Sequence, residues 1–346
     1  KDVTGYWVKI NGEQAHRAVD LLHDMLFHST FESKEMAREK KVIVEEIKMY
    51  EENPIMHIED LLEEAMFDSH VLGRNIAGTS ASVLGMTRKD VLAYRDRFYV
   101  PSNMVVVMAG RVPKDAQTLL RSTFGRVPAR EEGEPVRQGQ AFRREAMPVG
   151  MRVRVQEKPL DQVQLALGFP TAGRGSKEEP ALKLLATILG GTMSSRLFVE
   201  VREKRGLCYS VRAGHDAYAD VGAFQVRAGL DAKRVPQAMK VILGELRKVR
   251  RQGVTMAELK MAKEHLRGAL SLTLEDSSDR AEFYGRQELW TLKALSPDAW
   301  LSRYDRVSRA QIATAANEIL RPSDMSLAAV GPFKDEQALL RAANLL

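Results

Sequence analysis

The chain has 346 residues, of which 44% are hydrophobic and 28% are charged, a composition that is typical of a globular protein and excludes a disordered or fibrous one. The single cysteine excludes a disulfide framework and a Cys-rich metal site, and no apolar run is long enough to cross a membrane. The 52 Lys and Arg residues barely outnumber the 46 Asp and Glu residues, and aromatic residues make up only 6%, so the footprint of a nucleic-acid-binding protein is absent.

The chain starts at Lys1 rather than at a methionine, and its first ten residues lack the apolar core of a signal peptide. Residues 7–10 alternate like a strand, and apolar residues at helical spacing follow over about 14–27. We therefore expect a strand and an amphipathic helix, in a chain whose beginning looks truncated. Any targeting segment would lie upstream of Lys1, and on the residues present we expect a cytoplasmic protein.

The next predicted helix runs from about Ser33 to Tyr50 and carries two carboxylates, Glu39 and Glu46, on its apolar face. A buried carboxylate is costly unless a cation, hydrogen-bond donors or a metal ion satisfies it. Salt bridges are one interpretation, and spacing alone favours it. The other is a metal site with one direct ligand and one supporting carboxylate, because residues seven apart lie about 10 Å apart along a helix. The predicted inward face comprises Met36, Glu39, Val42, Ile43, Glu46, Ile47 and Tyr50.

Two segments in different halves of the chain match each other closely. Residues 87–101 and 308–322 each begin at a Thr or Ser suited to capping a helix and end at a proline, which stops the helix. An apolar strand pattern and a glycine follow in both, at 105–109 and at 326–330. Matching intervals and residue types indicate an internal repeat.

The repeat extends upstream, where the second half has a strand pattern at 224–227 and a helical pattern over about 235–249. Residues 126–150 are rich in Gly, Pro, Arg and Glu, which is typical of a linker. We predict an α+β fold of two repeated domains, 1–125 and 151–346, each a mostly antiparallel sheet packed with long helices. The second domain has about 70 residues more before its matching strand than the first, so we expect the first repeat to be truncated at its N-terminus.

A glycine-rich stretch at 190–198 leads into a helix that we expect to end at Gly206, a residue suited to the left-handed position after a helix. The double glycine is not a phosphate-binding loop, because the Gly-Lys-Ser/Thr ending is missing. A strand should follow, with Leu207, Tyr209 and Val211 on one face.

This corner between helix and strand brings together Arg202, on the last helical turn, and Tyr209, on the strand. Such a pair could bind a peptide carbonyl or carboxylate, or stabilise a tetrahedral oxyanion. A structural hydrogen bond across the corner is the other interpretation, and these residues alone favour it.

The seven histidines show neither a His-Glu-x-x-His nor a His-x-x-Glu-His spacing. His23 and His28 are five residues apart, which is poor spacing for one helix face. We expect all seven to be solvated or core residues, and we expect Cys208 to be a buried structural thiol.

Several motifs together resemble the pitrilysin/insulinase family of zinc metallopeptidases, and most closely its processing-protease branch, which includes mitochondrial processing peptidase. The resemblance covers nearly the whole chain in order, and its last motif is fairly specific. The matching segments are 39–47, 53–54, 72–79, 99–104, 190–198 and 202–209.

The resemblance implies that Glu46 is the third zinc ligand and that Glu39 is the carboxylate supporting it. It also implies that Arg202 and Tyr209 hold the substrate and stabilise the transition state. The two histidine ligands and the general-base glutamate would belong to a His-x-x-Glu-His segment upstream of Lys1. The implied fold is a clamshell of two repeated domains that close on an extended peptide.

We therefore expect a zinc-dependent metalloendopeptidase that hydrolyses peptides or presequences but is inactive as this chain alone, because its zinc site is incomplete. The expected cofactor is one zinc ion. The expected partners are a peptide substrate and an identical or related subunit in a dimer, but neither nucleic acid nor a membrane. The alternative is a non-catalytic peptide-binding or scaffold subunit that pairs with an active partner; the presence of both residue pairs favours the enzyme.

Overall fold

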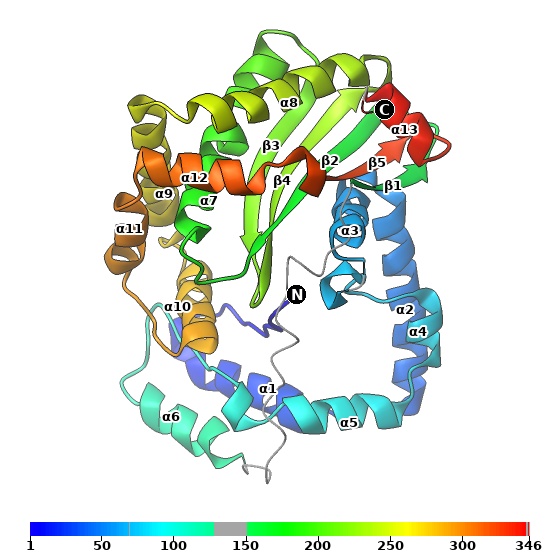
Figure 1. The fold of residues 1–346 in the computed structure, drawn as a ribbon. Coiled ribbons are helices and arrows are strands. Elements are labelled where there is room, and N and C mark those ends of the chain that lie inside the picture. Colours follow the sequence, from blue (N-terminus) through cyan, green and yellow to red (C-terminus); the bar gives the residue numbers. More distant parts are fainter. Residues whose placement is uncertain (69, 128–150, 344, 346) are drawn as a thin grey trace.

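The computed structural model describes residues 1–68, 70–127, 151–343 and 345 (Figure 1). Within the described part of the first half, all regular structure is helical. The α-helices there are α1 (Ala15–Phe27), α2 (Ser33–Glu52), α3 (Pro54–Phe67), α4 (Ser80–Gly85), α5 (Arg88–Phe98) and α6 (Ala116–Ser122).

The second half contains a five-stranded sheet with the strand order β1-β5-β2-β4-β3. The β1–β5 pair is parallel, and the other three pairs are antiparallel. The predicted α+β class is thereby confirmed. The strands are β1 (Arg152–Glu157), β2 (Gln162–Ala172), β3 (Cys208–Ala217), β4 (Val221–Asp231) and β5 (Ser326–Gly331).

One face of this sheet is covered by helices of the second half, and the main core lies between them. Leu185 of α7, Ile242 of α8 and Ile312 of α12 are buried in one apolar cluster with side chains of the central strands. The helices of this half are α7 (Glu179–Ala186), α8 (Val235–Gln252), α9 (Met256–Thr273), α10 (Ser277–Thr291), α11 (Pro297–Asp305), α12 (Arg309–Ile319) and α13 (Glu336–Ala342).

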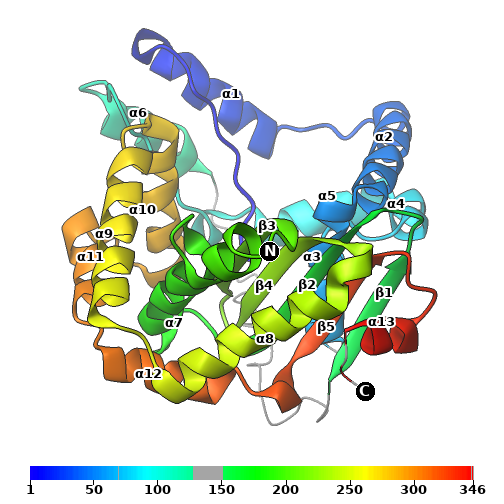
Figure 2. The ribbon, with the colours of Figure 1, turned by 90° about the horizontal axis from the view of Figure 1, so that it is seen from above.

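The opposite face of the sheet is covered by α3, which belongs to the first half of the chain (Figures 1 and 2). Leu62 and Met66 of α3 are almost fully buried against small residues of the sheet such as Ala166 and Ala223. Gly168 of β2 allows this close approach, because a Cβ at that position would overlap the Sδ atom of Met66. The two halves therefore share a core.

The helix and the proline turn of the internal repeat are confirmed, but its strand is not. Helices α5 and α12 both have 11 residues, and each starts with a capping box, Thr87 with Asp90 and Ser308 with Gln311. A 3₁₀ turn that starts at the predicted proline follows each helix. In the second half, the predicted strand and helix patterns lie within β4, β5 and α8.

Two strands that we predict in the first half, at 7–10 and at 105–109, are wrong: both segments are non-helical but neither belongs to a sheet. A strand requires a hydrogen-bonded neighbour, and alternation along the sequence does not supply one. Apolar side chains there stay exposed, as at Trp7, which is 75% exposed. Of the 24 exposed large hydrophobic residues in the described chain, 19 lie within residues 6–112. The described part of the first half contains no strand that its helices could cover.

The predicted division into residues 1–125 and 151–346 remains a prediction. Of the linker predicted at 126–150, residues 128–150 lie outside the described part. Where the chain is described, no helix combines the length and the apolar character needed to cross a bilayer.

Candidate functional site

Glu39 and Glu46 lie on α2, and the structure contradicts their predicted burial: both are exposed. The helix packs on α3 and α4 through a stripe centred on Ile47, which is 2% exposed. The two carboxylates lie on the adjacent stripe with Val42, Met49 and Tyr50, whose side chains are 44–53% exposed.

The physical reason is the placement of the neighbouring helices. The packed side of α2 is the stripe of residues 36, 40, 43 and 47, whose apolar members Met36, Ile43 and Ile47 face α3 and α4. The predicted inward face thus combined two adjacent stripes, of which only the one with Met36, Ile43 and Ile47 is packed. Spacing alone cannot say which of two adjacent stripes faces a neighbouring helix. Glu39 and Glu46 thus need no buried cation, because water solvates both.

Arg202 lies in a short helical segment, residues 196–203, whose second part is a π-helix from Phe198 to Glu203. Its guanidinium stacks over the ring of Phe198, with the central carbon 4.7 Å from the ring centroid. The Arg202 side chain is otherwise exposed. Because π-helical turns are rare and occur frequently at functional sites, this turn is a candidate position for a functional side chain.

The helical segment ends as predicted at Gly206, which has a left-handed φ of +55°. The Gly206 amide donates to the carbonyl of Arg202 at 2.9 Å, and the Leu207 amide donates to the carbonyl of Val201 at 2.9 Å. These bonds close the helix and turn the chain sharply into β3. Arg202 and the first residues of β3 are thereby held at one corner.

Tyr209 is the second residue of β3 and is 69% exposed. The pairing of β3 with β4 matches Cys208 to Leu230 and Ser210 to Gly229, so Tyr209 is an extra residue in a β-bulge. The predicted common face of Leu207, Tyr209 and Val211 is therefore wrong: Leu207 and Val211 are buried, whereas the bulge turns Tyr209 outward. The bulge is what makes this phenol accessible.

Cys208 lies between Arg202 and Tyr209 in the sequence, and its side chain is buried in the core, as predicted for a structural thiol. Burial raises the pKa of its thiol to about 11, although the nearby Arg202 charge acts in the opposite direction. The thiol is therefore protonated at neutral pH and does not take part in reactions as a thiolate.

The structure does not bring the α2 carboxylates and the Arg202–Tyr209 corner together. Helix α2 packs on α3, which adjoins β1 and β5, whereas Tyr209 lies on β3 at the opposite edge of the sheet (Figure 1). Among the residues described, no cluster of three or more His, Cys, Asp or Glu side chains is placed to hold a metal ion. The donors present do not form a zinc site by themselves, because such a site needs three or four.

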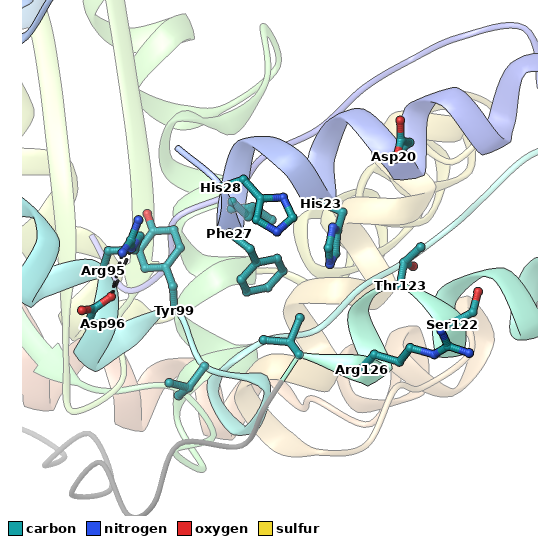
Figure 3. A pocket seen from close by; sticks show the side chains of 13 residues that line it. Asp20, His23, Phe27, His28, Arg95, Asp96, Tyr99, Ser122, Thr123 and Arg126 are labelled. Atoms are coloured by element: carbon teal, nitrogen blue, oxygen red, sulfur yellow. Dashed lines mark hydrogen bonds and ion pairs between the residues drawn. The ribbon is translucent and has the colours of Figure 1, made fainter. Parts of the chain in front are cut away.

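A separate pocket of about 570 Å³ opens between α1, α5 and the turn at 122–127 (Figure 3). The rings of His23 and His28 meet there edge to face, with centroids 5.3 Å apart. Sequence spacing misses this contact because α1 ends at Phe27, which frees His28 from the helical path. The pocket is lined by neither predicted residue pair.

Strand β3 also carries a buried histidine, His215, whose Nε2 lies 3.1 Å from the hydroxyl of Thr171. Burial lowers the pKa of His215 to about 4 from its ordinary value of 6.5. In the unfolded chain this imidazole takes up a proton at a higher pH than in the folded chain. The contribution of His215 to the free energy of unfolding is therefore present above pH 6.5 and is lost as the pH falls toward 4.

We therefore expect the free energy of unfolding to fall by about 2 kcal/mol between pH 7 and pH 5 through His215 alone. Denaturant titrations at the two pH values measure this difference, and His215→Gln should remove most of it. Substitution of the exposed His265 by Gln is the control and should leave the pH dependence intact. Equal pH dependence in the parent and His215→Gln would contradict the assignment.

Comparison with known proteins places both halves in one family. A family model described as insulinase (peptidase family M16) matches residues 1–80, and one described as peptidase M16 inactive domain matches residues 85–266. An uncharacterized zinc protease of Bacillus subtilis is 32% identical over 332 residues, which cover 96% of this chain and 79% of that protein. An uncharacterized zinc protease of Mycobacterium tuberculosis is 35% identical over 340 residues, which cover 98% and 77%.

Solved structures support the fold. A protease from Helicobacter pylori aligns with a TM-score of 0.81 at 20% identity, over 92% of this chain and 77% of that chain. A peptidase M16 inactive domain from Pseudomonas fluorescens aligns with a TM-score of 0.76 at 20% identity, over 94% and 76%. At this identity the likeness concerns the fold, and it agrees with the clamshell arrangement that we expect.

Proposed function

Because the chain belongs to the insulinase (peptidase M16) family, we propose that it acts in zinc-dependent hydrolysis of peptides or presequences, within the processing-protease branch. The observation that carries this proposal is the exposed pair of Arg202 and Tyr209 at one corner. A π-helical turn presents the first side chain and a β-bulge presents the second. Both side chains take little part in the core, since Arg202 is exposed and Tyr209 is 69% exposed.

In this proposal the Arg202 guanidinium binds a peptide carbonyl or carboxylate through its fork of N–H donors. The Tyr209 hydroxyl donates a hydrogen bond to the oxygen on which negative charge develops during hydrolysis. Both groups are exposed in this arrangement, so water competes for them. We therefore propose that they work when the two halves close on an extended peptide, which excludes that water.

We assign Glu46 as a zinc ligand and Glu39 as the carboxylate that supports it; the two lie seven residues, or about two turns, apart on the exposed stripe of α2. Bound zinc would supply an activated water and polarise the scissile carbonyl. The described residues do not complete such a site, so we expect this chain to bind zinc weakly and to hydrolyse peptides negligibly.

The test is a zinc titration of the 346-residue chain in competition with a chromophoric chelator. Glu46→Gln should weaken zinc binding by about 10–100-fold, and Glu39→Gln should weaken it less. Glu45→Gln is the matched control, since Glu45 is exposed on the same helix next to Glu46. Unchanged zinc affinity in Glu46→Gln removes this residue from the site, and peptidase activity of the parent chain that a chelator abolishes contradicts the predicted inactivity.

A second function, as a non-catalytic peptide-binding subunit, draws support from the match of residues 85–266 to a domain described as inactive. The binding of a fluorescein-labelled basic presequence peptide distinguishes the two. A scaffold subunit binds this peptide with the same affinity whether or not Glu46 is replaced by Gln and zinc is supplied. The enzyme proposal requires zinc to strengthen binding in the parent and not in Glu46→Gln.

A further inference from the structure

Arg196 forms the most extensive set of charged hydrogen bonds near the Arg202–Tyr209 corner. Its Nε and one terminal nitrogen donate to the two carboxylate oxygens of Glu258, at 2.6 and 2.9 Å. The same terminal nitrogen donates to the carbonyl of Gly253 at 3.1 Å. The side chains of Arg196 and Glu258 are only 18% and 24% exposed, so water screens this bidentate pair weakly.

These bonds connect three elements. Arg196 begins the helical segment 196–203, Gly253 ends α8, and Glu258 lies in the first turn of α9. Glu258 is itself fixed, because it accepts bonds from the backbone amide and the hydroxyl of Thr255 at 2.7 and 2.9 Å. The guanidinium therefore anchors the segment to a rigid helix start.

We propose that Arg196 is a positioning residue for Arg202, because its bond to Glu258 fixes how the helical segment 196–203 is rotated about its own axis. The inference rests on the proposed function for its consequence, the binding of peptide at Arg202. Leu197 and Val201 also hold the segment through burial in the core. Apolar packing has no preferred direction, however, whereas a bidentate ion pair has one.

Arg196 and Glu258 keep their opposite charges from mildly acidic to neutral pH, as this positioning role requires. Burial alone would raise the pKa of Glu258, but the hydrogen bonds from Arg196 and Thr255 outweigh it and hold the pKa at about 2. The carboxylate is thus ionised from mildly acidic pH upward. A lysine at position 196 keeps the charge but loses the fork, so Arg196→Lys tests geometry rather than charge.

The first experiment measures affinity for the fluorescein-labelled presequence peptide by anisotropy in Arg196→Lys, Arg202→Ala and the double variant. We expect about 10-fold weaker binding for Arg202→Ala and about 3-fold weaker binding for Arg196→Lys. In the Arg202→Ala background, Arg196→Lys should cause no further loss, because it acts through Arg202. An equal 3-fold loss in both backgrounds would overturn the positioning role.

Arg309→Lys is the matched control, because Arg309 donates to the carbonyl of Val254 at 2.8 Å and so holds the same loop without a hydrogen bond to the described segment 196–203. It should lower the unfolding midpoint in urea as Arg196→Lys does and leave peptide affinity unchanged. If both variants weaken peptide binding equally, Arg196 acts only through loop stability and the proposal is wrong.

The second experiment does not depend on peptide binding. A nitroxide label attached at Arg202→Cys, with Cys208→Ser to remove the native thiol, reports the order of the segment. We expect its spectrum to narrow with Arg196→Lys but not with Arg309→Lys. If the spectrum of the label does not change with Arg196→Lys, the positioning role is refuted. If the spectrum changes but Arg202→Ala leaves peptide affinity unchanged, only the proposed function is refuted.

Discussion

Replacement of Met66 by Ala is expected to lower the free energy of unfolding by about 2–5 kcal/mol, one of the two largest effects that we predict. Met66 is fully buried between α3 and the sheet, against Gly168 of β2. Its removal leaves a cavity in the contact that joins the two halves of the chain. Denaturant unfolding followed by circular dichroism measures the loss.

Met56→Ala on the same helix is the control, since Met56 is 46% exposed, and it should cost less than about 0.5 kcal/mol. If the two variants are equally stable, α3 is not held on this sheet as we describe. A lowered midpoint for residues 1–127 alone, with the sheet unaffected, would show that the two halves unfold separately rather than through a shared core.

The second large effect is expected for Gly190→Ala, with a loss of about 3 kcal/mol in the free energy of unfolding. Gly190 lies where a π-helical turn approaches β3, and an added Cβ would overlap the backbone nitrogen of Ala213 and lie 2.8 Å from the carbonyl carbon of Arg212. Backbone atoms cannot rotate away as a side chain can, so the strand must shift.

The neighbouring Gly191→Ala provides the control, because the atoms nearest its added Cβ belong to the side chain of Thr187, at 3.3 Å or more. We expect it to cost less than about 1 kcal/mol. Any movement of β3 also moves Tyr209 relative to Arg202, so Gly190→Ala should weaken peptide binding more than Gly191→Ala. Equal stability of the two variants would contradict the close approach of this turn to β3.

Local signals in the sequence predict much of the second half correctly. Ser308 and the proline 14 residues later delimit α12 and its 3₁₀ turn, and Gly206 ends the helical segment that carries Arg202. Each of these signals depends on groups within a few residues of one another. The resemblance to the insulinase family likewise depends on short motifs, and the two family matches confirm it.

The placement of the proposed site residues follows less completely from the sequence. Spacing correctly places Glu39 and Glu46 on one stripe, but their burial depends on where α3 and α4 pack. The exposure of Tyr209 depends on a bulge that only the register between β3 and β4 reveals. The roles of these residues in zinc and peptide binding remain predictions.

The sequence by itself predicted helices α1, α2, α5, α8 and α12, the repeated cap and proline turn, and the family, because capping bonds, proline stops and amphipathic spacing act within one segment. Only the tertiary structure decided that residues 7–10 and 105–109 are not strands, that α3 covers the sheet of the second half, and that Arg196 joins Glu258. Each of these outcomes requires a partner far away in the chain, and local patterns carry no information about which distant segment that partner is.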